Sequence, residues 1–132
     1  MPIKYRYDVD SNVVYEMGWG EVTFRDLEEY HKELLGLPLK PGFKDLADYT
    51  KAKVMLTSDE LWRIKNISNA IAELIGSADF KLAIVVNDNL SYGMARMFTM
   101  TSDVEQLEIM VFKTISEACA WLGIEEPSVE NI

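Results

Sequence analysis

Apolar and polar residues alternate near the start of the chain with the two-residue period of a β-strand. Residues 3–9 (IKYRYDV) have this period, residues 12–18 (NVVYEMG) are expected to form a second strand, and the polar residues between the two are typical of a turn. We therefore expect a β-hairpin. Three later segments predict further strands: FKDLADY at 43–49, FKLAIVVN at 80–87 and LEIMVFK at 107–113. The segment at 80–87 is almost wholly apolar, which is typical of a strand covered on both faces.

Between the strands, apolar residues recur with the 3.6-residue period of α-helices. Helices are expected over 24–35, 58–75, 91–100 and 115–122, and residues 50–56 (TKAKVML) are expected to be a connection. Three helices begin with a threonine followed three residues later by an acidic residue, as in a capping box: Thr23 with Asp26, Thr57 with Glu60, and Thr114 with Glu117.

The predicted order of elements is ββαβαβαβα. Strands that alternate with helices after the hairpin imply right-handed crossovers and a parallel core, so we expect an α/β fold with a mixed sheet and covering helices. A length of 132 residues is typical of one domain. We place that domain at residues 1–124 and a polar tail at 125–132.

The only histidine, His31, lies in the apolar stripe that Leu27 and Leu34 form on the first helix. One histidine excludes a site built from several histidines. We interpret His31 as a core imidazole with one local hydrogen bond; a catalytic base or a pH switch is the alternative.

The second helix has an apolar stripe that includes Ile64, Ser68, Ile71 and Leu74, and Trp62 falls on the opposite, polar side. An exposed tryptophan in the first turn of a helix is unexpected. Either the loop before the helix covers Trp62, or its ring contacts a partner, a ligand or a bilayer interface.

The segment 91–100 (SYGMARMFTM) is expected to form a helix with two different faces. Met94, Met97 and Phe98 share one stripe, which is expected to pack on the sheet; the alternative is that these methionines border an adaptable apolar cavity. Tyr92 and Arg96 lie one turn apart on the other face, with Met100 beside them, and this face is suited to binding.

The net charge of −9 argues against a nucleic-acid partner, because affinity for phosphate backbones depends on clustered Lys and Arg. Residues 40–65 nevertheless have six basic and four acidic side chains, a net charge of +2. Within them, Lys51 and Lys53 are candidates for contact with an anion. Ordinary scatter of solvated charges is the alternative interpretation.

Several classes of site have no signal in the sequence. Cys119 is the only cysteine, so an intrachain disulfide and a thiolate zinc site are excluded, and its place in the apolar stripe of the last helix predicts an inert thiol. There is no glycine-rich phosphate loop, nucleophile elbow or metal-spaced ligand set. We therefore expect no enzymatic activity, no cofactor and no metal.

The start of the chain lacks a signal peptide and no apolar run is long enough to span a membrane, so a cytoplasmic location is expected, with peripheral membrane contact left open.

Four stretches carry a resemblance over residues 1–124: GEVTFRDLEEY, PGFKDLADYTKAKVMLTSDEL, YGMARMF and VFKTISEACAWLG. Together with the order of elements, they resemble the SpoIIAA-like family of STAS-type domains. The resemblance implies a small STAS-like α/β sandwich and a non-enzymatic role. It also implies similarity in fold to CRAL-TRIO lipid carriers, and within the SpoIIAA-like branch it implies binding of apolar molecules and contact with membranes.

Anti-sigma-factor antagonists of the STAS type carry an Asp-Ser-Ser-Gly motif at the start of the second helix, where a serine is phosphorylated. The resemblance places residues 56–59 at this motif, with Thr57 or Ser58 as the acceptor. Leu56 replaces the aspartate and Asp59 replaces the glycine. A role of Thr57 as a helix cap explains this residue without a phosphoswitch.

Two functions follow from these observations. The first is a non-catalytic binding or regulatory domain that acts through a protein partner, and a homodimer is compatible with it. The alternative is a carrier of a small apolar ligand or lipid that touches membranes reversibly. A cavity between the helix at 91–100 and the second helix would favour the carrier, whereas a closed core would favour the protein partner.

Overall fold

The computed structural model describes residues 2–75, 80–100 and 107–127, apart from the side chains of 75, 98–100 and 107. The elements follow the predicted order ββαβαβαβα. Their bounds are β1 Ile3–Asp8, β2 Val13–Thr23, α1 Phe24–Leu34, β3 Lys44–Met55, α2 Ser58–Ile75, β4 Phe80–Val85, α3 Asn89–Met100, β5 Leu107–Phe112 and α4 Ile115–Leu122. The predicted tail at 125–132 lies partly outside the described residues.

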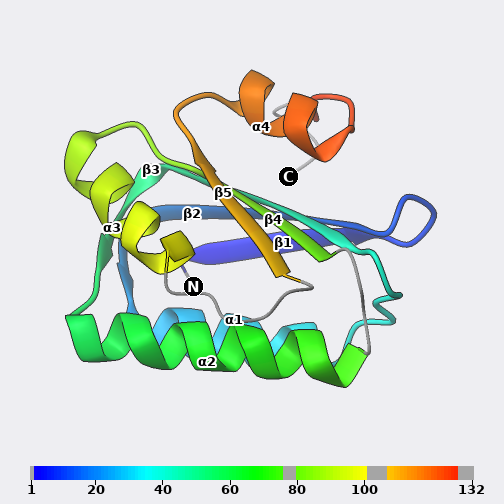
Figure 1. Cartoon of the computed structure of the whole chain (residues 1–132), viewed down its shortest axis with the longest axis horizontal. Coiled ribbons are helices and arrows are strands. Elements are labelled where there is room, and N and C mark those ends of the chain that lie inside the picture. Colours follow the sequence, from blue (N-terminus) through cyan, green and yellow to red (C-terminus); the bar gives the residue numbers. More distant parts are fainter. Residues whose placement is uncertain (1, 76–79, 101–106, 128–132) are drawn as a thin grey trace.

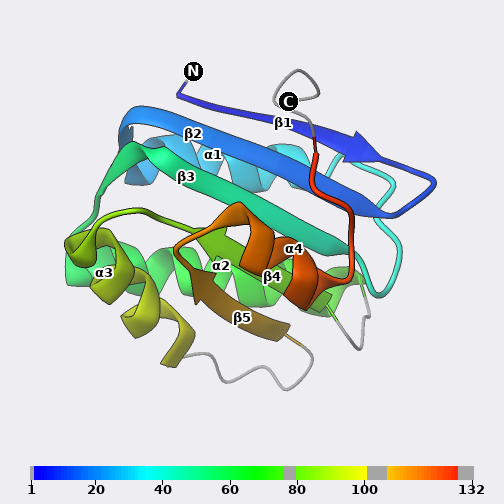
Figure 2. The ribbon, with the colours of Figure 1, turned by 90° about the horizontal axis from the view of Figure 1, so that it is seen from above.

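The five strands form one sheet in the order β1-β2-β3-β4-β5. The hairpin strands β1 and β2 are antiparallel, and every other neighbouring pair is parallel. Helices α1 and α2 lie side by side on one face of the sheet, and α4 lies on the other (Figure 1). Seen from above, α3 lies beside the β5 edge (Figure 2). The predicted α/β fold with a mixed sheet is confirmed.

The prediction that residues 50–56 are a connection is wrong, because β3 continues to Met55. The second half of β3 pairs with the second half of β2, where Trp19 lies opposite Lys51 and Thr23 lies opposite Met55. Alternate residues explain the pairing: Ala52 and Val54 are half-buried, whereas Lys51, Lys53 and Met55 are exposed. This period of two is that of a strand with one covered face.

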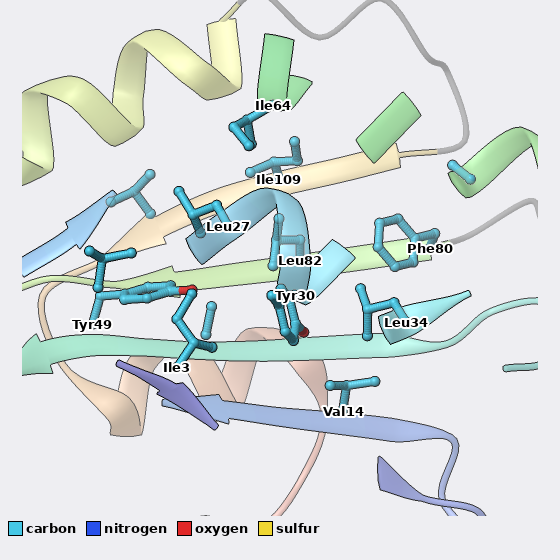
Figure 3. Packing of buried hydrophobic residues seen from close by; sticks show 14 of the residues in the cluster. Ile3, Val14, Leu27, Tyr30, Leu34, Tyr49, Ile64, Phe80, Leu82 and Ile109 are labelled. Carbon is cyan, nitrogen blue, oxygen red and sulfur yellow. The ribbon is translucent and has the colours of Figure 1, made fainter. Parts of the chain in front are cut away.

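Hydrophobic side chains form two cores on opposite faces of the sheet. The larger core lies between the sheet and helices α1 and α2, and includes Leu27, Tyr30 and Leu82 (Figure 3). The smaller core lies under α4 and includes Cys119, which is 2% exposed. Burial raises the pKa of the Cys119 thiol, and the prediction of a buried cysteine in this stripe is confirmed.

The predicted capping boxes are present at α1 and α2. At α1, the Asp26 amide donates to Thr23 Oγ1 and the Thr23 amide donates to Asp26 Oδ2. At α2, the Glu60 amide donates to Thr57 Oγ1 at 3.1 Å, and the Thr57 amide donates to Glu60 Oε1 at 2.9 Å. These bonds satisfy amide groups that have no partner within the helix.

Replacing Thr57 tests its role as a cap. We expect Thr57→Ala to lower the free energy of unfolding by about 1 kcal/mol, because an amide of the first turn loses its acceptor. Thr57→Asp should be nearly neutral, since Asp is also a good cap. Urea unfolding of the two variants measures the difference. Stoichiometric phosphate on Thr57 or Ser58 in protein from its own host would contradict a purely structural role.

Candidate ligand-binding site

The larger core is not completely filled. A cavity of about 120 Å³ lies between the sheet and the helices. Helix α1 contributes Leu27 and Leu34 to its wall, α2 contributes Ile64 and Ile71, and Leu82 of β4 forms part of its floor. Among the described residues that line it, none is Lys or Arg. The wall is therefore mainly apolar and without positive charge.

Helix α3 borders the same cavity from one end through Met94 and Ala95. Asp88 fixes the start of this helix, since its Oδ1 accepts a hydrogen bond from the Ser91 amide at 2.7 Å. The amide and hydroxyl of Ser91 hold the pKa of Asp88 below its usual range, so that Asp88 remains a charged acceptor. Helix α3 is thereby anchored at the end where the cavity reaches the surface.

A surface groove of about 600 Å³ adjoins this end of the cavity. The groove and the cavity share four lining residues, Val54, Leu56, Ser91 and Met94. The groove lies where β3 leads into α2 and β4 leads into α3, at the carboxyl ends of two parallel strands. The shared residues make the groove the natural entrance to the cavity.

Two carboxyl groups of the cavity lining, Glu16 and Asp45, lie on the neighbouring parallel strands β2 and β3. They are 4% and 3% exposed. The Tyr49 hydroxyl donates to Glu16 Oε2 at 2.6 Å, and the Tyr30 hydroxyl donates to Asp45 Oδ2 at 3.2 Å. The other oxygen of Asp45, Oδ1, is buried and has no hydrogen-bond partner among the described residues. We call Glu16, Asp45, Tyr30 and Tyr49 the carboxyl cluster.

Burial controls the ionisation of the carboxyl cluster. It raises the pKa of Asp45 well above the usual range, and the nearby Glu16 raises it further. Burial and the two carboxyl groups also raise the pKa values of Tyr30 and Tyr49, so both hydroxyls stay neutral donors. Asp45 therefore keeps its proton at pH values where an exposed aspartate would lose it.

His31 occupies the side of the cavity where α1 meets α2. Its Nδ1 lies 2.7 Å from the Leu27 carbonyl oxygen, which only accepts, so Nδ1 carries the proton. Its Nε2 lies 3.1 Å from Ser68 Oγ and accepts from that hydroxyl. Burial lowers the pKa of His31, which favours the neutral ring. The predicted local hydrogen bond is confirmed, and Ser68 adds a second bond between the helices.

Trp62 is 51% exposed on the outer side of α2, so the exposure expected from the helical period is confirmed. The Lys65 ammonium lies 4.7 Å from the centre of the Trp62 ring. Leu74, which was expected in the buried stripe, is 75% exposed, and that prediction is wrong. Leu74 lies near the end of α2, one residue before the end of the described helix.

The predicted faces of α3 are only partly correct. Met94 is half-buried and lines the cavity, but Met97 is 56% exposed, so its predicted packing on the sheet is wrong. The physical reason is that α3 lies beside the β5 edge of the sheet (Figure 2). Arg96 is exposed, while Tyr92 is half-buried with the Lys113 ammonium 5.0 Å from its ring centre. The side chains of Phe98 and Met100 lie outside the described residues.

The structure places the candidate anion contacts near the entrance. Lys53 lines the groove, and Lys51 lies two residues earlier on the same exposed face of β3. Thr57 also lines the groove, next to Ser58 at the start of α2. Trp62, Arg96 and Tyr92 are not among its lining residues. The predicted candidates therefore divide into an entrance group and an outer group.

The carboxyl cluster was missed by the sequence analysis, although the sequence holds a signal for it. Asp45 is two residues from Phe43 and from Ala47, and residues two apart lie on the same face of a strand, so the sequence places a carboxyl group on an apolar face. Glu16 follows Val14 in the same way. Pairing of Val14 with Asp45 then brings the two carboxyl groups to one site.

Comparison with known proteins identifies the fold of the chain. No family model matches the sequence, and no curated protein matches it. A solved structure of an uncharacterised protein of the DUF3478 family from Shewanella loihica, described as having a SpoIIAA-like fold, matches with a TM-score of 0.57. The two sequences are 20% identical, and the match covers 91% of each chain. The chain therefore has the SpoIIAA-like fold that its resemblance implied.

Two further observations bear on the class of site. In the described part of the chain, no helix is both long and apolar enough to cross a membrane. Over the same residues, no group of three or more His, Cys, Asp or Glu side chains is arranged to hold a metal ion.

Proposed function

We propose that this protein is a non-catalytic binding domain that holds a small, largely apolar ligand in the cavity between the sheet and helices α1, α2 and α3. The observation that carries the proposal is the cavity itself, which α2 borders with Leu61 and Ile64 and α3 borders with Met94 and Ala95. A space between these two helices is the feature that favours a ligand carrier over a domain with a closed core.

The volume limits the size of the ligand. An engineered apolar cavity of about 150 Å³ in another protein stays dry and binds benzene. A cavity of about 120 Å³ fits a single ring or a short branched chain. A longer molecule can extend through the positions of Val54 and Met94 into the groove, where its outer part would meet solvent.

The surroundings of the groove favour reversible contact with a membrane during loading. Met55 and Leu90 line the groove and are 49% and 69% exposed, and Lys53 lines it beside them. Exposed apolar side chains suit a bilayer interface. The charge of Lys53 is offset by Glu60 and Asp88, which also line the groove, so the apolar side chains would make the contact. A ligand could then pass from the bilayer to the cavity without crossing water.

Action through a protein partner is the second candidate function, and exposed Trp62 favours it. Tryptophan is a frequent energetic centre of protein interfaces. Trp62 lies on the outer side of α2, and the same helix borders the cavity through its inner side. A partner bound at Trp62 would therefore contact the helix that a ligand touches from within.

Filling the cavity tests the proposed function. We expect anisole, a small uncharged aromatic ether, to bind the native protein and to bind Ala95→Leu at least about tenfold more weakly, because the added side chain occupies the cavity end. Ala70→Leu is the matched control, since Ala70 lies on the exposed side of α2 and should leave affinity unchanged. Chemical-shift titration by NMR measures both affinities and reports which residues are perturbed.

Two results would contradict this proposal. One is the absence of any shift change at Leu82, Ile84 or Met94 when the native protein is saturated with anisole. The other is equal affinity of Ala95→Leu and Ala70→Leu, which would place the bound molecule outside the cavity.

A further inference from the structure

The carboxyl cluster gives the cavity a polar end whose hydrogen bonding is incomplete. Buried polar atoms nearly always have a partner, and each exception needs an explanation. Asp45 Oδ1 is such an exception: Asp45 is 3% exposed, it lines the cavity, and Oδ1 has no partner among the described residues. Its neighbour Oδ2 is already engaged by the Tyr30 hydroxyl. Asp45 keeps its proton and hydrogen-bonds through it to the Glu16 carboxyl group. With that proton on Oδ2, Oδ1 is the carbonyl oxygen, and a ligand in the cavity would meet it as an acceptor.

We infer that the ligand of this cavity carries a hydroxyl or amino group, which donates a hydrogen bond to Asp45 at the carboxyl cluster while the apolar part packs against α1, α2 and β4. The inference rests on the proposed function and adds the chemistry of the ligand's inner end. A hydroxyl group suits the two carboxyl groups of Glu16 and Asp45, because it can donate a hydrogen bond to one of them and accept a hydrogen bond from the other.

The same geometry argues against an anionic inner end. The negative charge of Glu16 already raises the pKa of the neighbouring Asp45. A carboxylate or phosphate placed beside Glu16 would be repelled, and none of the described lining residues is a Lys or Arg that could offset the charge. Fatty acids and phosphorylated compounds could enter only with their charged group outside, near Lys53.

The remaining polar groups of the wall do not replace Asp45 in this role. The Ser68 hydroxyl is engaged with His31 Nε2, and His31 Nδ1 is engaged with the Leu27 carbonyl. The Tyr49 hydroxyl is engaged with Glu16. Asp45 is therefore the group of the inner wall that gains most from a donor on the ligand.

The inference is tested with two isomers that differ in the donor. p-Cresol and anisole have the same atoms, but only p-cresol has a hydroxyl hydrogen. We expect p-cresol to bind the native protein about tenfold more tightly than anisole, as a hydrogen bond to a buried carboxyl group allows. Benzylamine should bind, whereas benzoate, with its negative charge, should not. NMR titration at neutral pH gives all four affinities.

Variants of Asp45 assign the effect to this residue. In Asp45→Leu the advantage of p-cresol over anisole should disappear, while anisole still binds and thereby shows that the cavity is intact. In Asp45→Asn the advantage of p-cresol should persist, because the amide still offers polar atoms, but benzylamine should bind more weakly because a carboxyl group is gone. The second variant also keeps a partner for Tyr30, so it tests the assignment if the leucine variant does not fold.

The outcomes separate the two proposals. If anisole and p-cresol bind the native cavity with equal affinity, the inference about the donor is overturned and the proposed function stands. If neither isomer perturbs the cavity residues, the proposed function fails, and the inference fails with it. Tight binding of benzoate in the cavity would overturn the inference alone.

Discussion

Gly18→Ala is expected to lower the free energy of unfolding by about 3 kcal/mol, a large effect for one added methyl group. Gly18 lies in β2 where the pairing with β3 shifts register, and the Tyr49 ring packs directly over it. A Cβ atom at position 18 would overlap that ring. Tyr49 would have to move, and its hydrogen bond to buried Glu16 would break. Urea unfolding, which is commonly two-state for domains of this size, measures the loss.

Gly93→Ala is the matched control for this prediction. Gly93 lies in α3 with nothing within 4 Å of the position of an added Cβ, so alanine should stabilise by about 0.5 to 1 kcal/mol through its better helix propensity. A double-mutant cycle with Tyr49→Leu identifies the clash. If Gly18→Ala costs as much in the Tyr49→Leu background as in the native protein, the ring is not the cause, and the account of this close approach is wrong.

Most of the fold could be predicted because its signals are local. The capping box at Thr57 is set by residues four positions apart or fewer, and the structure shows both of its bonds. The length of β3 was missed for a reason that is not local. Residues 51–55 form a strand because they pair with residues 19–23 of β2. The sequence of this segment alone does not identify the strand with which it pairs.

The candidate site was predictable only in part, because it depends on the pairing register of the strands and on where each helix lies relative to the sheet. The helical period identified Trp62 as exposed, but the same reasoning placed Met97 in the core, since it assumed that α3 covers the sheet. The carboxyl cluster requires that Val14 pair with Asp45, and a shift of one residue would turn Asp45 to the other face. Strand pairing is a property of the whole sheet, so the cluster emerges only with the structure.

Asp45→Asn is expected to change how stability depends on pH. The native pKa of Asp45 is raised well above that of an unfolded aspartate, by burial first and by Glu16 second. Between the two pKa values the native state binds more protons than the unfolded state, so stability falls as pH rises. The contribution of Asp45 to the free energy of unfolding is complete below about pH 4. It is lost at up to about 1.4 kcal/mol per pH unit as the pH rises toward the native pKa.

Asparagine cannot ionise, so the variant should gain stability relative to the native protein as pH increases from about 5 to about 8. The lowered pKa of His31 has the opposite sign, because a neutral buried histidine destabilises the native state as pH falls below about 6.5. This term is common to both proteins and cancels in their difference. Urea unfolding at several pH values therefore isolates Asp45.

A second substitution separates the two causes of the raised pKa. Glu16→Gln removes the neighbouring charge but leaves Asp45 buried. In the Glu16→Gln background, the pH-dependent difference in stability that Asp45→Asn produces should therefore remain, and it should level off at a lower pH.

A constant difference in stability between the native protein and Asp45→Asn, from about pH 5 to about pH 8, would show that Asp45 is ionised in the folded state. The carboxyl cluster would then hold two negative charges, which the hydroxyls of Tyr30 and Tyr49 would have to stabilise. Two charges at that site would favour an ammonium group over a hydroxyl at the inner end of the ligand.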